Sequence, residues 1–122
     1  MARMVHFELN SPDSDKSVKF FKKVFDWDIN AWEGPQEYHL VTTGPDVTPG
    51  INGAIMPSAD GEPRTVNTLQ VDDIDATLRA IVSAVGEVCV EKHAIPKIGW
   101  NAYCKDPAGL LFGVHQFDLE AG

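Results

Sequence analysis

Two residues near the start of the chain, His6 and Glu8, have the types and the spacing of an acid–base pair or of the beginning of a metal site. They lie in MVHFELN (4–10), whose alternation of apolar and polar residues predicts a strand. Residues two apart in a strand point to one face, so we expect the imidazole and the carboxylate side by side. Such a pair suits proton transfer or metal binding, and it also suits an ordinary solvated strand face.

The elements that must position this pair form one pattern that occurs twice. The first half predicts a strand at 4–10, a helix within 11–27, and strands at 28–32, 37–43 and 51–56. The second half predicts a strand at 66–71, a helix within 72–86, and strands at 87–95, 100–105 and 110–117. A shift of 60 residues places His6 on Val66 and Phe21 on Ile81.

This repetition predicts the α+β class, as a single domain spanning 1–122. It consists of two βαβββ modules, at 1–57 and 65–118, joined by a linker at 58–64. We expect two curved mixed sheets that enclose a cavity, with the helices outside.

The composition excludes several kinds of partner. The formal net charge of −8 would repel nucleic acids and anionic membrane surfaces, so neither is expected to bind. No apolar run approaches the roughly 18 residues of a membrane span, and the first ten residues are too polar for a signal peptide. Cys89 and Cys104 form no metal-binding or disulfide motif. We expect a cytoplasmic protein whose partner is a small molecule.

Three stretches resemble the vicinal oxygen chelate superfamily, which contains glyoxalase I, bleomycin-resistance proteins and extradiol dioxygenases. They are His6 followed by SDKSVKFFKKVFDW, then TVNTLQVDDIDATLRAI, then KDPAGLLFGV. The resemblance covers essentially the whole chain and implies the tandem fold, whereas one fold hosts many chemistries. It also implies a homodimer, with the cavity built within one chain or by module exchange between two chains.

The resemblance implies four metal-ligand positions, on the first and last strand of each module. In this sequence they fall on His6, Ala54, Val66 and Gly113. A catalytic divalent ion needs about three protein ligands, and His6 alone has a side-chain ligand atom. We therefore expect no metal at these positions and no other cofactor.

Alternation places further residues on the expected cavity face. The predicted ligand-binding residues are Thr68, Gln70, Met56, His115 and the aromatic Tyr38 and Trp100. A displaced metal site at His6, Glu8 and His115 is a less favoured alternative, whose ligand types suit zinc or iron.

Three functions remain, in order of preference. The first is binding of a small metabolite or drug without catalysis, as in the bleomycin-resistance proteins. The second is a metal-independent lyase, isomerase or hydrolase of a small oxygenated metabolite, with His6 and Glu8 as catalytic residues. The third is a metal-dependent glyoxalase or dioxygenase, which the replaced ligand positions disfavour. Whether the protein is an enzyme stays open at this point.

Overall fold

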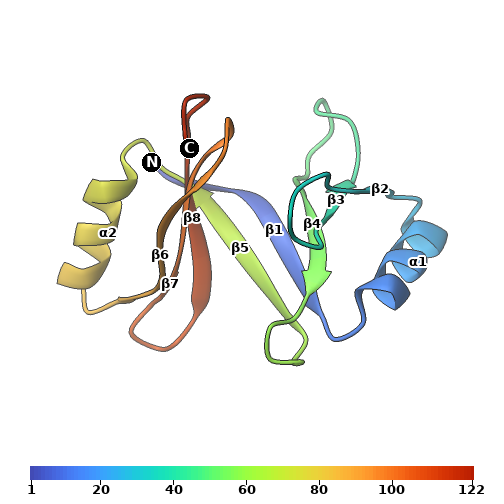
Figure 1. The fold of residues 1–122 in the computed structure, drawn as a ribbon, viewed down its shortest axis with the longest axis horizontal. Coiled ribbons are helices and arrows are strands. Elements are labelled where there is room, and N and C mark those ends of the chain that lie inside the picture. The colour runs from blue at the N-terminus through green and yellow to red at the C-terminus, as the bar shows by residue number, and fades with distance from the viewer. The chain divides into compact units, whose positions relative to one another are not determined.

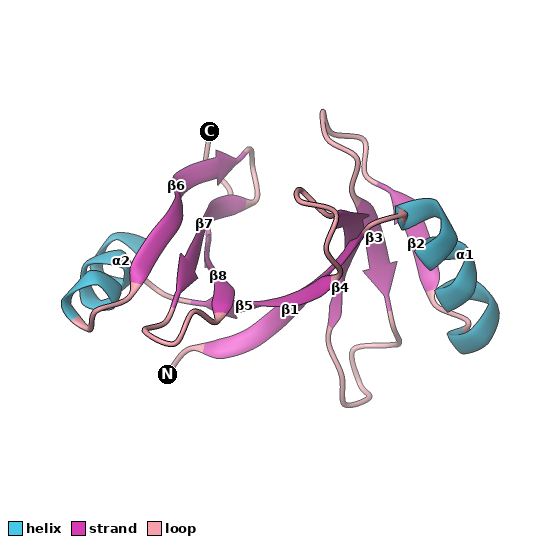
Figure 2. Cartoon of the chain, turned by 90° about the horizontal axis from the view of Figure 1, so that it is seen from below, coloured by secondary structure: helices cyan, strands magenta, loops and turns pink.

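The structure, a computed structural model, describes residues 1 to 122 and divides into two compact units (Figure 1). The N-terminal unit is His6–Val66, and the C-terminal unit comprises Met1–Val5 and Asn67–Gly122. Each unit contains one helix that packs on its own strands, as Figure 2 shows for α1 beside β2 and α2 beside β6.

The N-terminal unit contains strands in the order β2-β3-β4-β1. The elements are β1 (Arg3–Ser11), α1 (Ser14–Phe25), β2 (Asp28–Ala31), β3 (His39–Thr42) and β4 (Asn52–Pro57). Strand β1 pairs with β4 in parallel, and the other two pairings are antiparallel. Helix α1 begins where the Asp13 side chain accepts a hydrogen bond from the Lys16 amide at 3.2 Å, and it ends at Asp26 in a left-handed conformation.

The C-terminal unit repeats this arrangement with strands in the order β5-β8-β7-β6. The elements are β5 (Arg64–Gln70), α2 (Ile74–Ser83), β6 (Glu87–Ile95), β7 (Gly99–Lys105) and β8 (Leu111–Phe117). Strand β5 pairs with β8 in parallel, and the other two pairings are antiparallel. Asp73 caps α2 as Asp13 caps α1, since its side chain accepts from the Ala76 amide at 3.1 Å.

Each sheet packs its apolar face against its helix. In the N-terminal unit the buried residues Ile29, Val41 and Ile55 are packed by Phe7, Leu9, Val18, Phe21 and Trp27. In the C-terminal unit the buried residues Ile74, Ala102 and Val114 are packed by Val71, Leu78, Ile81, Trp100 and Phe112. Because side chains alternate along a strand, the residues between these positions form the opposite face of each sheet.

The predicted α+β class and the two βαβββ modules are confirmed. Most strand boundaries differ from the prediction by one or two residues; in the first hairpin, for example, one strand ends at Ala31 and the next begins at His39. There the Trp32 amide donates to the Tyr38 carbonyl at 2.8 Å. The enclosed cavity stays a prediction. Neither α1 nor α2 combines the length and the apolar character that crossing a bilayer requires.

Candidate functional site

The polar face of the N-terminal sheet carries the residues with the clearest chemistry. His6, Glu8 and Asn10 alternate along β1 with Phe7 and Leu9, which belong to the core beneath α1. The pairing with β4 sets Asn52, Ala54 and Met56 beside this row. Glu8 is only 5% exposed, so this face holds a carboxylate away from most of the solvent.

Tyr38 links the two residues that the sequence singles out. Its hydroxyl donates to Glu8 Oε2 at 2.7 Å, and its oxygen lies 2.8 Å from His6 Nε2. Because the hydroxyl has a single hydrogen and gives it to Glu8, Nε2 of His6 is the donor in the second bond. The result is a hydrogen-bonded chain from imidazole to phenol to carboxylate. The rings of His6 and Tyr38 are nearly parallel, with centroids 6.4 Å apart.

The environment of His6 favours its neutral form. Burial lowers the pKa of the imidazole from its usual value of 6.5, and the Glu8 carboxylate offsets part of that shift. A neutral imidazole is a donor at one nitrogen and an acceptor at the other. With Nε2 turned to Tyr38, the acceptor nitrogen is Nδ1.

Asn10 adds a donor to the same row. Its side-chain nitrogen is buried and has no hydrogen-bond partner, an arrangement that costs free energy unless some group accepts from it. Asn10 also lines a pocket of about 360 Å³, together with Leu9, Ser11, Pro12, Ser17, Phe21, Pro63, Arg64 and Thr65. That volume is at the lower end of small-molecule sites.

The polar face of the C-terminal sheet is built mainly from neutral groups. Thr68 and Gln70 on β5 lie beside Gly113 and His115 on β8. His115 Nδ1 is 3.1 Å from the side-chain oxygen of Asn101, which is itself buried. His115 belongs to this unit, whereas His6 and Glu8 belong to the other, so the displaced metal site stays a prediction.

Trp100 lies apart from the other predicted ligand-binding residues. Its ring packs in the core beneath α2, and its indole nitrogen donates to Asp118 at 3.0 Å. The ammonium of Lys92 lies 4.6 Å from the ring centroid. These contacts favour a packing role for Trp100, and its predicted role in ligand binding stays a prediction.

The four residues at the expected metal-ligand positions offer one imidazole and no carboxylate. Ala54 and Val66 are buried at 0% and 2% exposure. A Cβ placed on Gly113 would lie 2.8 Å from the Thr68 hydroxyl oxygen, so Thr68 already occupies the space that a longer side chain would need. This residue set does not fit a metal held by three protein ligands.

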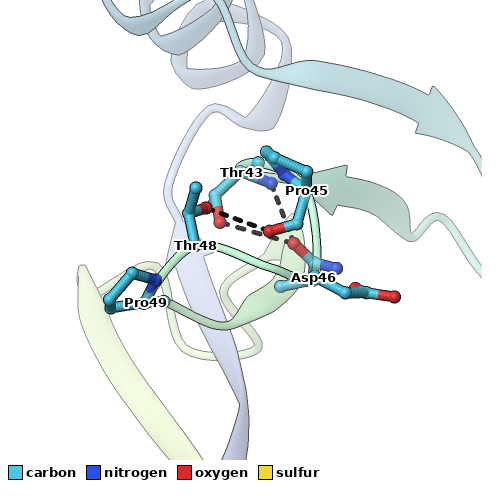
Figure 3. Close-up of a pocket in the computed structure, with 8 residues that line it drawn as sticks. Thr43, Pro45, Asp46, Thr48 and Pro49 are labelled. Carbon is cyan, nitrogen blue, oxygen red and sulfur yellow. Dashed lines mark hydrogen bonds between the residues drawn. The ribbon is translucent and has the colours of Figure 1, made fainter.

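A second pocket lies in the loop between β3 and β4, away from the predicted residues (Figure 3). It has a volume of about 60 Å³ and is lined by residues between Thr43 and Asn52. The Thr43 amide donates to the Asn52 side chain at 2.9 Å, and the Thr48 hydroxyl donates to the Pro45 carbonyl at 2.9 Å. The loop thus satisfies its own polar groups, as expected for a turn rather than a phosphate loop.

Comparison with known proteins identifies the family. Residues 3–114 match the family model described as the Glyoxalase/Bleomycin resistance protein/Dioxygenase superfamily. The chain belongs to this superfamily. It is 26% identical over 119 residues to "Putative glyoxylase CFP32" from Mycobacterium tuberculosis and Mycobacterium bovis. The aligned region covers 94% of this chain and 46% of that protein. The chain therefore spans about half the length of the curated relatives it matches.

Solved structures of the superfamily share the fold of this member. Methylmalonyl-CoA epimerase from Mycobacterium tuberculosis is 13% identical, with a TM-score of 0.72 and coverage of 94% of this chain and 87% of that one. The Mn(II)-bound glyoxalase from Novosphingobium aromaticivorans is 23% identical, with a TM-score of 0.65 and coverage of 99% and 40%. At these identities the likeness extends to the fold alone.

Sequence reasoning paired His6 with Glu8 correctly but missed the residue that connects them. The sequence predicts Tyr38 as an aromatic ligand contact, which stays a prediction, and gives no sign that its hydroxyl bridges His6 and Glu8. Asn10 was missed, although its position two residues after Glu8 puts it on the same face. Asn101 was missed as well, because its bond to His115 depends on the register of β7 and β8.

Proposed function

We propose that this member of the superfamily binds a small oxygen-bearing metabolite or drug through the polar face of its N-terminal sheet, without the metal that other members use. The observation that carries the proposal is the row of His6, Glu8 and Asn10 with Tyr38 bonded across it. The row presents an ionisable carboxylate and an unpaired amide donor. Carbonyl, hydroxyl or carboxylate groups of a ligand are the natural partners of such groups.

The proposed absence of the family's metal follows from the ligand chemistry. One imidazole among His6, Ala54, Val66 and Gly113 is too few ligands for a catalytic ion. Elemental analysis of protein purified without chelator tests this directly. A stoichiometric metal that is lost in His6→Ala would contradict the proposal.

A ligand screen tests the binding proposal. The panel contains bleomycin, the glutathione hemithioacetal of methylglyoxal, methylmalonyl-CoA, and small hydroxy and oxo acids. We expect at least one compound to raise the melting temperature, and Glu8→Gln and Asn10→Ala to reduce the shift. Thr48→Ala, which alters the self-contained loop, is the matched control and should leave the shift unchanged. Equal shifts in all variants would place the ligand elsewhere.

A second candidate function is metal-independent proton transfer, favoured by the hydrogen-bonded chain from His6 through Tyr38 to Glu8. A carboxylate held in place by a phenol can remove a proton from a carbon next to a carbonyl group. Tyr38 and His6 would then fix its orientation. The reaction class would be isomerisation or elimination of a small carbonyl compound.

Deuterium incorporation separates the two functions. A compound that binds is incubated in D2O with the protein, and its carbon-bound hydrogens are followed by NMR. Catalysis predicts incorporation that Glu8→Gln abolishes while binding persists. Binding without catalysis predicts no incorporation by any variant.

The assembly and compartment remain proposals as well. We propose a homodimer, which light scattering during size-exclusion chromatography tests. Cytoplasmic residence, which the composition predicts, is tested by fractionation of cells that express the protein.

A further inference from the structure

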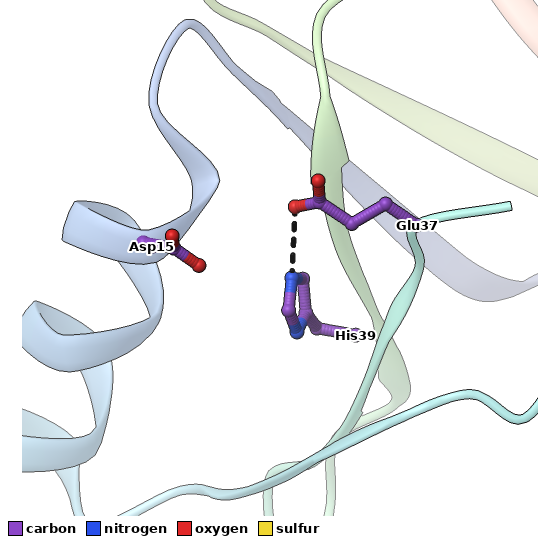
Figure 4. A group of neighbouring side chains, drawn as sticks. All are labelled: Asp15, Glu37 and His39. Atoms are coloured by element: carbon purple, nitrogen blue, oxygen red, sulfur yellow. Dashed lines mark hydrogen bonds and ion pairs between the residues drawn. The ribbon is translucent and has the colours of Figure 1, made fainter.

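A second cluster of metal-ligating side chains lies on the opposite face of the N-terminal sheet, next to α1 (Figure 4). It consists of Asp15, Glu37 and His39, whose ligand atoms all lie within 4.8 Å of one another. Asp15 comes from the first turn of α1, His39 is the first residue of β3, and Glu37 lies two residues before that strand. None of the three coincides with a position at which the family's metal is expected.

Strand alternation explains why this cluster exists beside the polar face without overlapping it. Tyr38 points to the polar face, where it bonds His6 and Glu8. Its neighbours Glu37 and His39 therefore point to the other side, toward α1. The three consecutive residues thus serve two faces of one sheet.

The cluster is partly held in place by hydrogen bonds. The Ser14 hydroxyl donates to Glu37 Oε2, and His39 Nε2 lies 3.1 Å from the same oxygen. The His39 side chain is 16% exposed, whereas that of Glu37 is 52% exposed. The imidazole is thus fixed against the protein, and the carboxylate side is open to an ion from solution.

The hydrogen bonds at Glu37 explain how the side chains of Glu37 and His39 are held, but they do not involve Asp15. The Asp15 carboxylate makes no hydrogen bond or ion pair in the structure, yet it is turned toward the other two (Figure 4). The ion pairs of the structure join Lys16 to Asp13, Arg64 to Asp60 and Lys92 to Asp75, and no lysine or arginine pairs with Asp15 or Glu37. An acidic residue also suits the first turn of a helix, so a direct measurement is needed to separate the two roles.

We propose that Asp15, Glu37 and His39 bind one divalent transition-metal cation. One imidazole with two carboxylates is a ligand set that zinc, manganese and iron accept. The cation would relieve the repulsion between two carboxylates that have no lysine or arginine partner. The imidazole nitrogen that binds the metal must present a lone pair, so binding through Nε2 would replace the hydrogen bond between His39 and Glu37.

Calorimetric titration with zinc chloride, on protein first freed of metal by a chelator, tests the site. We expect one ion per chain, with affinity that falls in acidic solution because an imidazolium has no lone pair. Asp15→Asn and His39→Gln should each weaken binding at least about tenfold, since each removes a ligand. Asp15→Asn changes an exposed side chain, so the test stands even where His39→Gln fails to fold.

Matched controls locate the ion. Asp46→Asn and His93→Gln remove an exposed acid and an exposed histidine elsewhere and should leave the affinity unchanged. His6→Ala should also leave it unchanged, which separates this site from the family's expected position. Zinc binding that is absent from the unaltered chain, or that Asp15→Asn leaves intact, would overturn the proposal. Binding lost only in His6→Ala would contradict both this site and the metal-free function.

Discussion

The polar faces of the two sheets differ although the strands beneath them follow one pattern. The N-terminal face carries an imidazole and a carboxylate bridged by Tyr38, whereas the C-terminal face carries Thr68 and Gln70 at the matching strand. On the C-terminal face, the His115 imidazole is hydrogen-bonded to the neutral side chain of Asn101. The two modules thus place different side chains on equivalent strands, and the chain from imidazole through phenol to carboxylate lies in the N-terminal one.

The helix-facing sides of the sheets are far more alike. Each helix begins at an aspartate whose side chain accepts a hydrogen bond from a first-turn amide, and each sheet buries branched apolar side chains beneath its helix. Packing and capping act in both modules alike, because each must bury an apolar face to fold. The polar faces carry no such requirement and are free to differ.

The largest expected difference between the modules concerns the glycines of the two last strands. A Cβ on Gly53 would lie 2.3 Å from the backbone oxygen of Phe7, whereas a Cβ on Gly113 would meet the Thr68 hydroxyl at 2.8 Å. A side chain can rotate away but a paired backbone cannot. We expect Gly53→Ala to lower the free energy of unfolding by about 3 kcal/mol and Gly113→Ala by about 1 kcal/mol. Urea denaturation measures both, and equal losses would contradict this account.

Tyr38→Phe tests whether the bridge stabilises the N-terminal face. The change removes the donor to the buried Glu8 carboxylate and the acceptor for His6. We expect the free energy of unfolding to fall by about 2 kcal/mol, because a buried charged acceptor loses a partner. Trp32→Phe, which keeps an aromatic ring against Tyr38, is a suitable control. A loss from Tyr38→Phe no larger than that of the control would show that the bridge contributes little.

The two helix caps should respond equally, unlike the two polar faces. Asp13→Ala and Asp73→Ala each remove a side-chain acceptor for a first-turn amide. We expect a loss of about 1 kcal/mol from either change. Chemical denaturation of the two variants checks this. A cap effect confined to one module would show that the similarity of the helix-facing sides is only geometric.

The smallest expected effect is the pH dependence contributed by His6. Burial lowers the pKa of His6 in the folded protein, while Glu8 acts in the opposite direction. The unfolded chain therefore binds the proton more readily, and folding stability falls as the pH drops below the ordinary histidine value near 6.5. The difference between the unaltered chain and His6→Gln across this range isolates the effect. A steeper loss of folding stability at low pH in His6→Gln than in the unaltered chain would contradict this account. An NMR titration of His6 gives the same answer independently.

The fold was largely predictable because its determinants are local and repeated. Alternating residues in MVHFELN, the apolar stripe from Val18 to Phe25, and turn residues such as Pro12 and Asp13 specify strand, helix and boundary without distant contacts. The repeat then supports each assignment in one half by its counterpart in the other.

The candidate site was predictable only where its residues share one strand. His6 and Glu8 are two apart, so alternation alone brings them together. Tyr38 reaches them from a segment 30 residues away, across a sheet whose strand order the sequence does not state. The cluster of Asp15, Glu37 and His39 has the same origin, since it requires the first turn of α1 to approach residues 37–39.

The segment from Glu37 to His39 has a consequence for how this protein can vary. Because its side chains alternate between two faces, a slip of β3 by one residue against β2 and β4 would reverse all three directions. Tyr38 would then leave His6 and Glu8, and His39 would leave Asp15, in a single event. The pairing of β3 with its two neighbours thus maintains the hydrogen-bonded chain on one face and the cluster on the other.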